Sequence, residues 1–130
     1  MALPPRVRAA MTALSRIELR HLRYFLAVAD TLHFGRAAER LCMSQPPLSQ
    51  AIQQLEDALG VAVFERHSRK VALTPAGQAL LAPARQLLAD LHAAIGAAQA
   101  AARGERGLLR VAYVGSAVFS VLPAIVARFH

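Results

Sequence analysis

The 130-residue sequence has one cysteine, Cys42, and lacks the histidine and cysteine spacings that bind metal ions. A single cysteine excludes an internal disulfide and is consistent with a reducing cytoplasm. The five histidines form no HExxH pattern, and no CxxC pair is present. An enzyme would need a nucleophile beside a base or a metal cluster, and the sequence shows neither. We therefore expect no metal site, no cofactor and no enzymatic activity.

Acidic residues are also scarce, with 8 Asp and Glu against 15 Lys and Arg, a formal net charge of +7. A basic balance favours an anionic partner, nucleic acid first and a membrane surface second. The charge is unevenly spread, because Arg6, Arg8 and Arg16 lie in a leader without acids. Residues 34–74 hold five basic and four acidic residues, a net charge of only +1. Net charge alone therefore does not establish DNA binding.

Long apolar runs are nearly absent. The one candidate, residues 111–127 (VAYVGSAVFSVLPAIVA), reaches only the lower limit of the roughly 17–25 residues that a membrane-spanning helix needs. Gly115, Ser116 and Pro123 interrupt it, and Val111–Val114 has the pattern of a strand. We interpret the run as a strand, a turn and a helix, and expect no membrane insertion.

The first 16 residues, MALPPRVRAAMTALSR, lack the unbroken apolar core of a signal peptide. We expect them to form a flexible extension, within which Met11 offers an alternative start. A transit peptide is the less favoured alternative.

The segment SQPPLSQAIQQLEDALG, residues 44–60, predicts a helix that starts with two adjacent prolines. Apolar residues recur along it at helical spacing, at Leu48, Ile52, Leu55 and Leu59. Ser44 suits the N-cap position, which puts the prolines in the first turn, where their missing N–H groups cost little. Gly60 suits the end of the helix.

Two earlier helices are predicted at residues 17–30 and 34–41. In the second of them, FGRAAERL, Ala37 and Ala38 face inward, where small side chains let another helix approach closely. A short helix, a tight turn and a second helix form the helix-turn-helix plan.

A basic hairpin is predicted next. Val61–Glu65 and Val71–Leu73 have the alternation of strands, and RHSRK between them suits a hairpin tip. We interpret this hairpin as a wing. Thr74 and Pro75 then favour the start of a new helix, with Thr74 as its N-cap.

That helix is predicted to run from Pro75 to about Arg103. Its apolar residues alternate three-residue and four-residue spacing, at Leu81, Ala84, Leu88, Leu91, Ile95, Ala98 and Ala102. Such a seam is typical of a coiled coil, so we expect dimerisation. Packing of the helix on its own domain is the alternative. Pro83 is expected to bend its first turns.

The predicted organisation has four parts. An extension of residues 1–16 precedes a winged helix-turn-helix domain of residues 17–74 and a linker helix of residues 75–103. Residues 104–130 would be a hinge followed by one strand and one helix, the opening of an α/β domain that they cannot complete. The fold class is mainly α.

These elements, in this order, resemble the LysR-type transcriptional regulators of bacteria. The resemblance covers Glu18 to about Arg103 and is carried by AAERL, SQPPLSQAIQQLE, the LG that follows, and LTPAG. It implies a winged helix-turn-helix with a two-stranded wing, a dimerising linker helix, and an effector domain like that of periplasmic binding proteins.

The resemblance also implies a function. Such a regulator would bind an interrupted inverted repeat in double-stranded DNA, as a homodimer through the 75–103 helix or as a dimer of dimers. A small-molecule inducer would act only in a full-length form, and Ser116 aligns with the start of the family's inducer pocket.

The polar face of the 45–59 helix is the candidate DNA surface. Glutamine can pair with adenine through two hydrogen bonds, serine can serve several base edges, and proline methylenes can touch a thymine methyl. The resemblance assigns base contacts to Gln45, Pro46, Pro47, Ser49 and Gln50, and a minor-groove contact to Arg69 of the wing. Many relatives have arginine in place of Gln50, which leaves base preference there open. The phosphate candidates are Arg36, Ser44, Gln53, Arg66 and Lys70.

Other polar residues have structural interpretations. His33 is placed to cap the second helix, and Cys42 is interpreted as a small apolar filler in the turn rather than a redox sensor. Glu56 and Asp57 are expected to be solvated or paired with Arg40. A protein-interaction module that uses the alanine-rich helix alone remains the main alternative to a DNA-binding protein.

Overall fold

The computed structural model describes residues 1–67 and 70–104. Its contacts divide the chain into one unit of residues 1–92 and another of residues 93–130. Arg69, Ser116 and the strand and helix predicted after the hinge lie outside the described residues.

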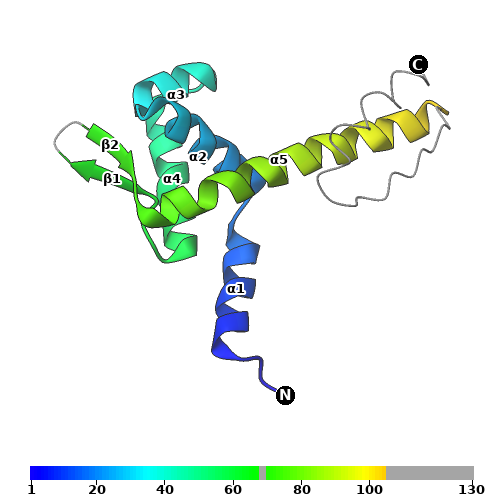
Figure 1. Ribbon diagram of the computed structural model, residues 1–130, viewed down its shortest axis with the longest axis horizontal. Coiled ribbons are helices and arrows are strands. Elements are labelled where there is room, and N and C mark those ends of the chain that lie inside the picture. Colours follow the sequence, from blue (N-terminus) through cyan, green and yellow to red (C-terminus); the bar gives the residue numbers. More distant parts are fainter. Residues whose placement is uncertain (68–69, 105–130) are drawn as a thin grey trace, which may run out of the picture. The chain divides into compact units, whose positions relative to one another are not determined.

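Three helices build the core of the first unit: α2 (Leu19–Thr31), α3 (Phe34–Arg40) and α4 (Gln45–Leu59) (Figure 1). All three lie within two residues of the predicted bounds, and those of α4 are as predicted. Buried apolar residues of these helices form one cluster with three buried residues that follow α4. The cluster consists of Leu22, Phe25, Val28, Ala37, Ala38, Leu48, Ile52 and Leu55 of the helices, together with Val63, Phe64 and Ala84. The fully buried Ala37 confirms that small side chains let α3 pack closely.

The start of α2 is held by side chains. The buried His21 accepts a hydrogen bond from the Glu18 N–H at its Nδ1 (2.9 Å), so its Nε2 carries the proton and donates to Gln54 of α4 (3.1 Å). One imidazole therefore both caps α2 and attaches it to α4. On the exposed side, the Arg20 guanidinium donates to Glu18, which lowers the pKa of this carboxyl below its usual value.

The turn between α3 and α4 corrects one expectation. Cys42 has a left-handed backbone (φ 54°) and is exposed, so it does not fill the turn. Main-chain hydrogen bonds close the turn instead, from Cys42 N–H to the Glu39 carbonyl and from Met43 N–H to the Ala38 carbonyl. The left-handed conformation points the cysteine side chain outward.

The wing consists of β1 (Phe64–His67) and β2 (Lys70–Leu73), an antiparallel pair in which Phe64 faces Leu73 and His67 faces Lys70. The first strand begins three residues later than predicted. The buried Val63 gives its N–H to a glutamate side chain rather than to a neighbouring strand, and Val61 is exposed.

A single long helix, α5 (Pro75–Ala102), follows the wing and continues through Pro83. Thr74 caps it as predicted, since its Oγ1 accepts from the Gly77 N–H (3.0 Å) and donates to the Ala62 carbonyl (2.7 Å). Gly77 and Ala84 are its only buried residues. Further along, large apolar side chains are exposed at Leu87 (52%), Leu91 (37%) and Ile95 (48%).

The N-terminal segment differs from the expectation of a flexible extension, because residues Pro5–Arg16 form a helix, α1. Pro5 occupies the first helical position, and the alanine, leucine and methionine that follow are good helix formers. None of its residues is buried. Within the described ranges, no helix has the length and apolarity needed to cross a bilayer.

Gly77→Ala should lower the free energy of unfolding by about 1–3 kcal/mol, the usual penalty for overpacking. The added Cβ would lie 2.2 Å from the Val63 carbonyl oxygen and 2.8 Å from a Leu73 methyl, so the backbone must shift. Gly96→Ala, on an open side of the same helix, is the matched control and should stabilise the protein by about 0.5–1 kcal/mol. Urea unfolding measures both, and equal stability of the two variants would contradict the close packing.

Candidate nucleic-acid interface

The two faces of α4 are sharply different. Leu48, Ile52 and Leu55 are each 0% exposed and pack into the core. The opposite, polar face is open to solvent, with Gln45, Pro46, Pro47, Gln50 and Gln53 exposed and Ser49 half-buried. Every α4 residue to which the sequence assigned a base contact is therefore accessible to a partner.

The first turn of α4 has few backbone N–H groups that need a hydrogen-bond partner. Ser44 occupies the N-cap position with an extended backbone, but its side chain makes no capping hydrogen bond. Pro46 and Pro47 remove two of the N–H groups that the start of a helix leaves unpaired. The Ser44 hydroxyl is exposed and not used by the helix.

Three elements meet around one hollow near this end of α4. Gln45 lines it from α4, Phe34 and Gly35 from the start of α3, and Lys70 from the wing; Leu32, His33, Arg66 and Val71 complete the lining. Three of the sequence-predicted site residues, Gln45, Arg66 and Lys70, are thus brought together although 25 residues separate Gln45 from Lys70 in the sequence. Arg36 is exposed on α3 but does not line the hollow.

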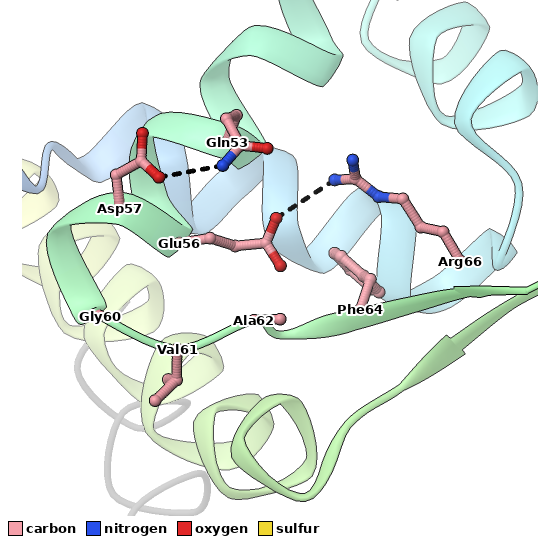
Figure 2. Close-up of a pocket in the computed structure, with 8 residues that line it drawn as sticks. All are labelled: Gln53, Glu56, Asp57, Gly60, Val61, Ala62, Phe64 and Arg66. Atoms are coloured by element: carbon pink, nitrogen blue, oxygen red, sulfur yellow. Dashed lines mark hydrogen bonds and ion pairs between the residues drawn. The ribbon is translucent and has the colours of Figure 1, made fainter.

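Glu56 corrects a second expectation (Figure 2). It is only 8% exposed and pairs with Arg66, not with Arg40. Its Oε2 accepts from the Val63 N–H (2.8 Å), and its Oε1 lies 3.2 Å from Nη2 of Arg66. The chain reverses at Gly60, with a left-handed φ of 75°, and this reversal brings the start of the wing back to Glu56.

Arg66 and Gln53, two of the phosphate candidates, already have partners within the protein. The Arg66 guanidinium contacts Glu56 and lies over the Phe34 ring, 5.1 Å from its centre. Its side chain remains 44% exposed. Gln53 donates a hydrogen bond from its Nε2 to the exposed Asp57, one turn further along α4 (2.9 Å; Figure 2).

His33 caps α3 as expected. Its Nδ1 accepts a hydrogen bond from the Arg36 N–H (3.0 Å). The same side chain also lines the hollow between α3, α4 and the wing, so one residue both caps α3 and forms part of this surface.

The role of Glu56 was not predicted from the sequence, although its position in α4 gives one signal. Glu56 lies four residues after Ile52, so helical spacing places it on the apolar face, where an unpaired carboxylate is costly. An acid at such a position predicts a buried partner, but periodicity alone does not say which one.

Comparison with known proteins gives a consistent result. Residues 19–78 match the family model described as "Bacterial regulatory helix-turn-helix protein, lysR family". The chain is 52% identical over 114 residues to the HTH-type transcriptional regulator AlsR of Bacillus subtilis, a match that covers 88% of the chain and 38% of that protein.

Solved structures agree in fold. The DNA-binding domain of BenM in a complex with catB site 1 DNA superposes with a TM-score of 0.68 at 42% identity, covering 71% of this chain and 99% of that one. Full-length CbnR in complex with its target DNA superposes with a TM-score of 0.63 at 44% identity. This match covers 68% of this chain and 31% of the CbnR chain. The chain thus spans less than half the length of AlsR and of full-length CbnR. AlsR is named as a regulator rather than as an enzyme, in agreement with the sequence analysis.

His33→Ala should lower the free energy of unfolding by about 0.5–2 kcal/mol, because the Arg36 N–H loses its acceptor. His33→Asn is the matched control and should keep most of the stability, since asparagine is a favourable N-cap residue. Thermal unfolding compares the two, and amide exchange at Arg36 should accelerate in the alanine variant alone. Equal losses in both variants would show that His33 stabilises α3 in some other way.

Proposed function

Because the chain belongs to the LysR family of bacterial regulatory proteins, we propose that it is a sequence-specific DNA-binding regulator of transcription. The observation that carries the proposal is the orientation of α4. Leu48, Ile52 and Leu55 on its aliphatic face are fully buried, and its glutamines and prolines are exposed beside the wing. In a helix-turn-helix protein, the second helix enters the major groove with its N-terminal residues against the bases.

Base contacts are assigned to the exposed face of α4. Gln45 and Gln50 can each form two hydrogen bonds with an adenine, and Ser49 can serve several base edges. Pro46 and Pro47 add an apolar surface that suits a thymine methyl. From its place in the sequence, Arg69 would reach the minor groove from the wing.

Phosphate contacts are assigned to groups that the fold leaves available. Lys70 and Arg36 are exposed cations, and the Ser44 hydroxyl is unused by the helix cap. Such contacts carry little sequence information but fix the register of a protein on the duplex. Gln53 could add a contact only by exchanging its bond to Asp57.

We further propose dimerisation through α5. Leu87, Leu91 and Ile95 expose large apolar side chains in a row along the helix, which a second copy of the helix could cover. Two copies related by a two-fold axis would read two half-sites, which suits an interrupted inverted repeat. Dimers of dimers and control by a small-molecule inducer would require the rest of a full-length protein. A chromosomal target would place the protein in the cytoplasm.

The protein-interaction module is the competing proposal, since the same exposed row on α5 would suit a partner protein. It gives no reason for the exposed Gln-Pro-Pro turn of α4 or for a basic wing beside it. Two experiments separate the proposals.

Gln50→Ala should reduce discrimination at one base pair of each half-site by about 1–3 kcal/mol, the contribution of a two-pronged base contact. Selection from random duplexes measures this as loss of preference at that position with other positions retained. Gln86→Ala is the matched control, because Gln86 is exposed on α5 and, within residues 1–67 and 70–104, bonds only to Asp90. Unchanged preference in Gln50→Ala would exclude Gln50 as a base contact, and absence of any preference in the wild type would favour the interaction module.

Ile95→Glu should weaken dimerisation at least about tenfold, because it places charge in an apolar seam. Ala97→Glu is the control, since Ala97 is also exposed but lies outside the seam. Sedimentation equilibrium measures the dimer, and duplex selection should return single half-sites for Ile95→Glu but inverted repeats for the control. An unaltered dimer in Ile95→Glu would exclude this seam.

A further inference from the structure

We propose that Glu56 is a positioning residue that holds the wing in register with α4, and that Arg66 serves this link rather than a DNA phosphate. The inference rests on the proposed DNA binding and concerns how its two contact surfaces are kept together. It assigns to Arg66 a different role from the one that its place in the sequence indicated.

The Glu56 carboxylate joins two points of the chain to α4. One oxygen accepts from the Val63 N–H, at the residue before β1, and the other contacts Arg66 within β1. A carboxylate that receives two such bonds in a site only 8% exposed restrains both the position and the direction of the strand.

The Arg66 guanidinium extends the link to a third element. It lies over the ring of Phe34, the first residue of α3. Phe34 meets Phe64 of β1 edge-on, with ring centres 6.0 Å apart, and Phe64 packs 5.4 Å from Phe25 of α2. The wing strand β1 is therefore linked to α4 and α3 through Arg66, and to α2 and α3 through Phe64.

The wing needs such an anchor because it is small. It has four residue pairs, and an isolated two-stranded hairpin is at best marginally stable in water. Thr74 holds its base through the Val63 and Ala62 carbonyls. Among the described residues, the Glu56–Arg66 pair is the only ion pair between the wing and a helix.

Loss of the pair should therefore act on the wing selectively. The face of α4 is set by buried leucine and isoleucine side chains, which the substitution leaves in place. The preference for particular bases at the positions that α4 contacts should persist. The preference at the base pairs beneath the wing should weaken. The dependence of affinity on salt should change little, because neither side chain of the pair contacts a phosphate and Lys70 keeps its charge.

The test uses Glu56→Gln, Arg66→Met and their double variant, in the whole chain, on the duplex selected by the wild type. Glutamine keeps an acceptor for the Val63 N–H but removes the charge, and methionine keeps an apolar stem over Phe34. Each single variant should bind about tenfold more weakly, within the range of coupling between contacting residues, and the double variant should be no worse. Lys70→Gln is the benchmark for a phosphate contact, with a salt slope lower by about 0.9.

Arg66→Lys keeps the proposal testable if the uncharged variants fail to fold. It preserves the positive charge but not the planar fork, so positioning predicts weakened preference beneath the wing with an unchanged salt slope. A phosphate role predicts binding close to that of the wild type.

Two results would overturn the proposal. One is a salt slope in Arg66→Met that falls as in Lys70→Gln, with uniform weakening across sequences. The other is a folded Glu56→Gln variant with wild-type affinity and wild-type preference beneath the wing. A wild-type chain that selects no sequence at all would overturn the proposed function itself, an outcome distinct from both.

Discussion

Burial of one face of α4 is the constraint on which the rest of the structure depends. Leu48, Ile52 and Leu55 are fully enclosed, and each contributes roughly 1.5–3 kcal/mol relative to an exposed side chain. Turning the helix by one residue would expose them and bury glutamines without partners, so its rotation is set. The proline-led N-terminus stays in solvent because the stripe begins only at Leu48. The exposed polar face is thus the necessary counterpart of the core.

The wing is held by a different kind of force. Val63 and Phe64 bury apolar surface at its base, but the strands beyond them are largely exposed. A buried carboxylate is costly unless it is paired, and Glu56 is tolerated because Val63 and Arg66 supply its hydrogen bonds. Such a pair adds little net stability compared with an apolar contact. It does specify the direction of the strand, which the proposed DNA contacts of the wing would require and which apolar burial alone does not provide.

The helices at the two ends of the described chain, α1 and α5, each expose three large apolar side chains. On α5, the first turns are covered through Gly77 and Ala84, and exposure begins at Leu87. The proposed dimer contact therefore begins at the point where the domain stops covering α5. On α1, Val7, Met11 and Leu14 are exposed as well, and this helix has no buried residue.

The sequence by itself determined the features that depend on neighbours within a few residues. The bounds of α4, the caps by Thr74 and His33, the stop at Gly60 and the exposed glutamine and proline face follow from helical spacing and end chemistry. The helix of residues 5–16 was within reach of the same rules and was missed, because the segment was tested only as a signal peptide and then taken as a flexible extension. Only the tertiary structure decided that Glu56 meets Arg66, that Cys42 turns outward, and that Gln45 and Lys70 line one hollow. These contacts join segments after the chain has reversed, and hydrophobic periodicity records which face is buried but not what that face meets.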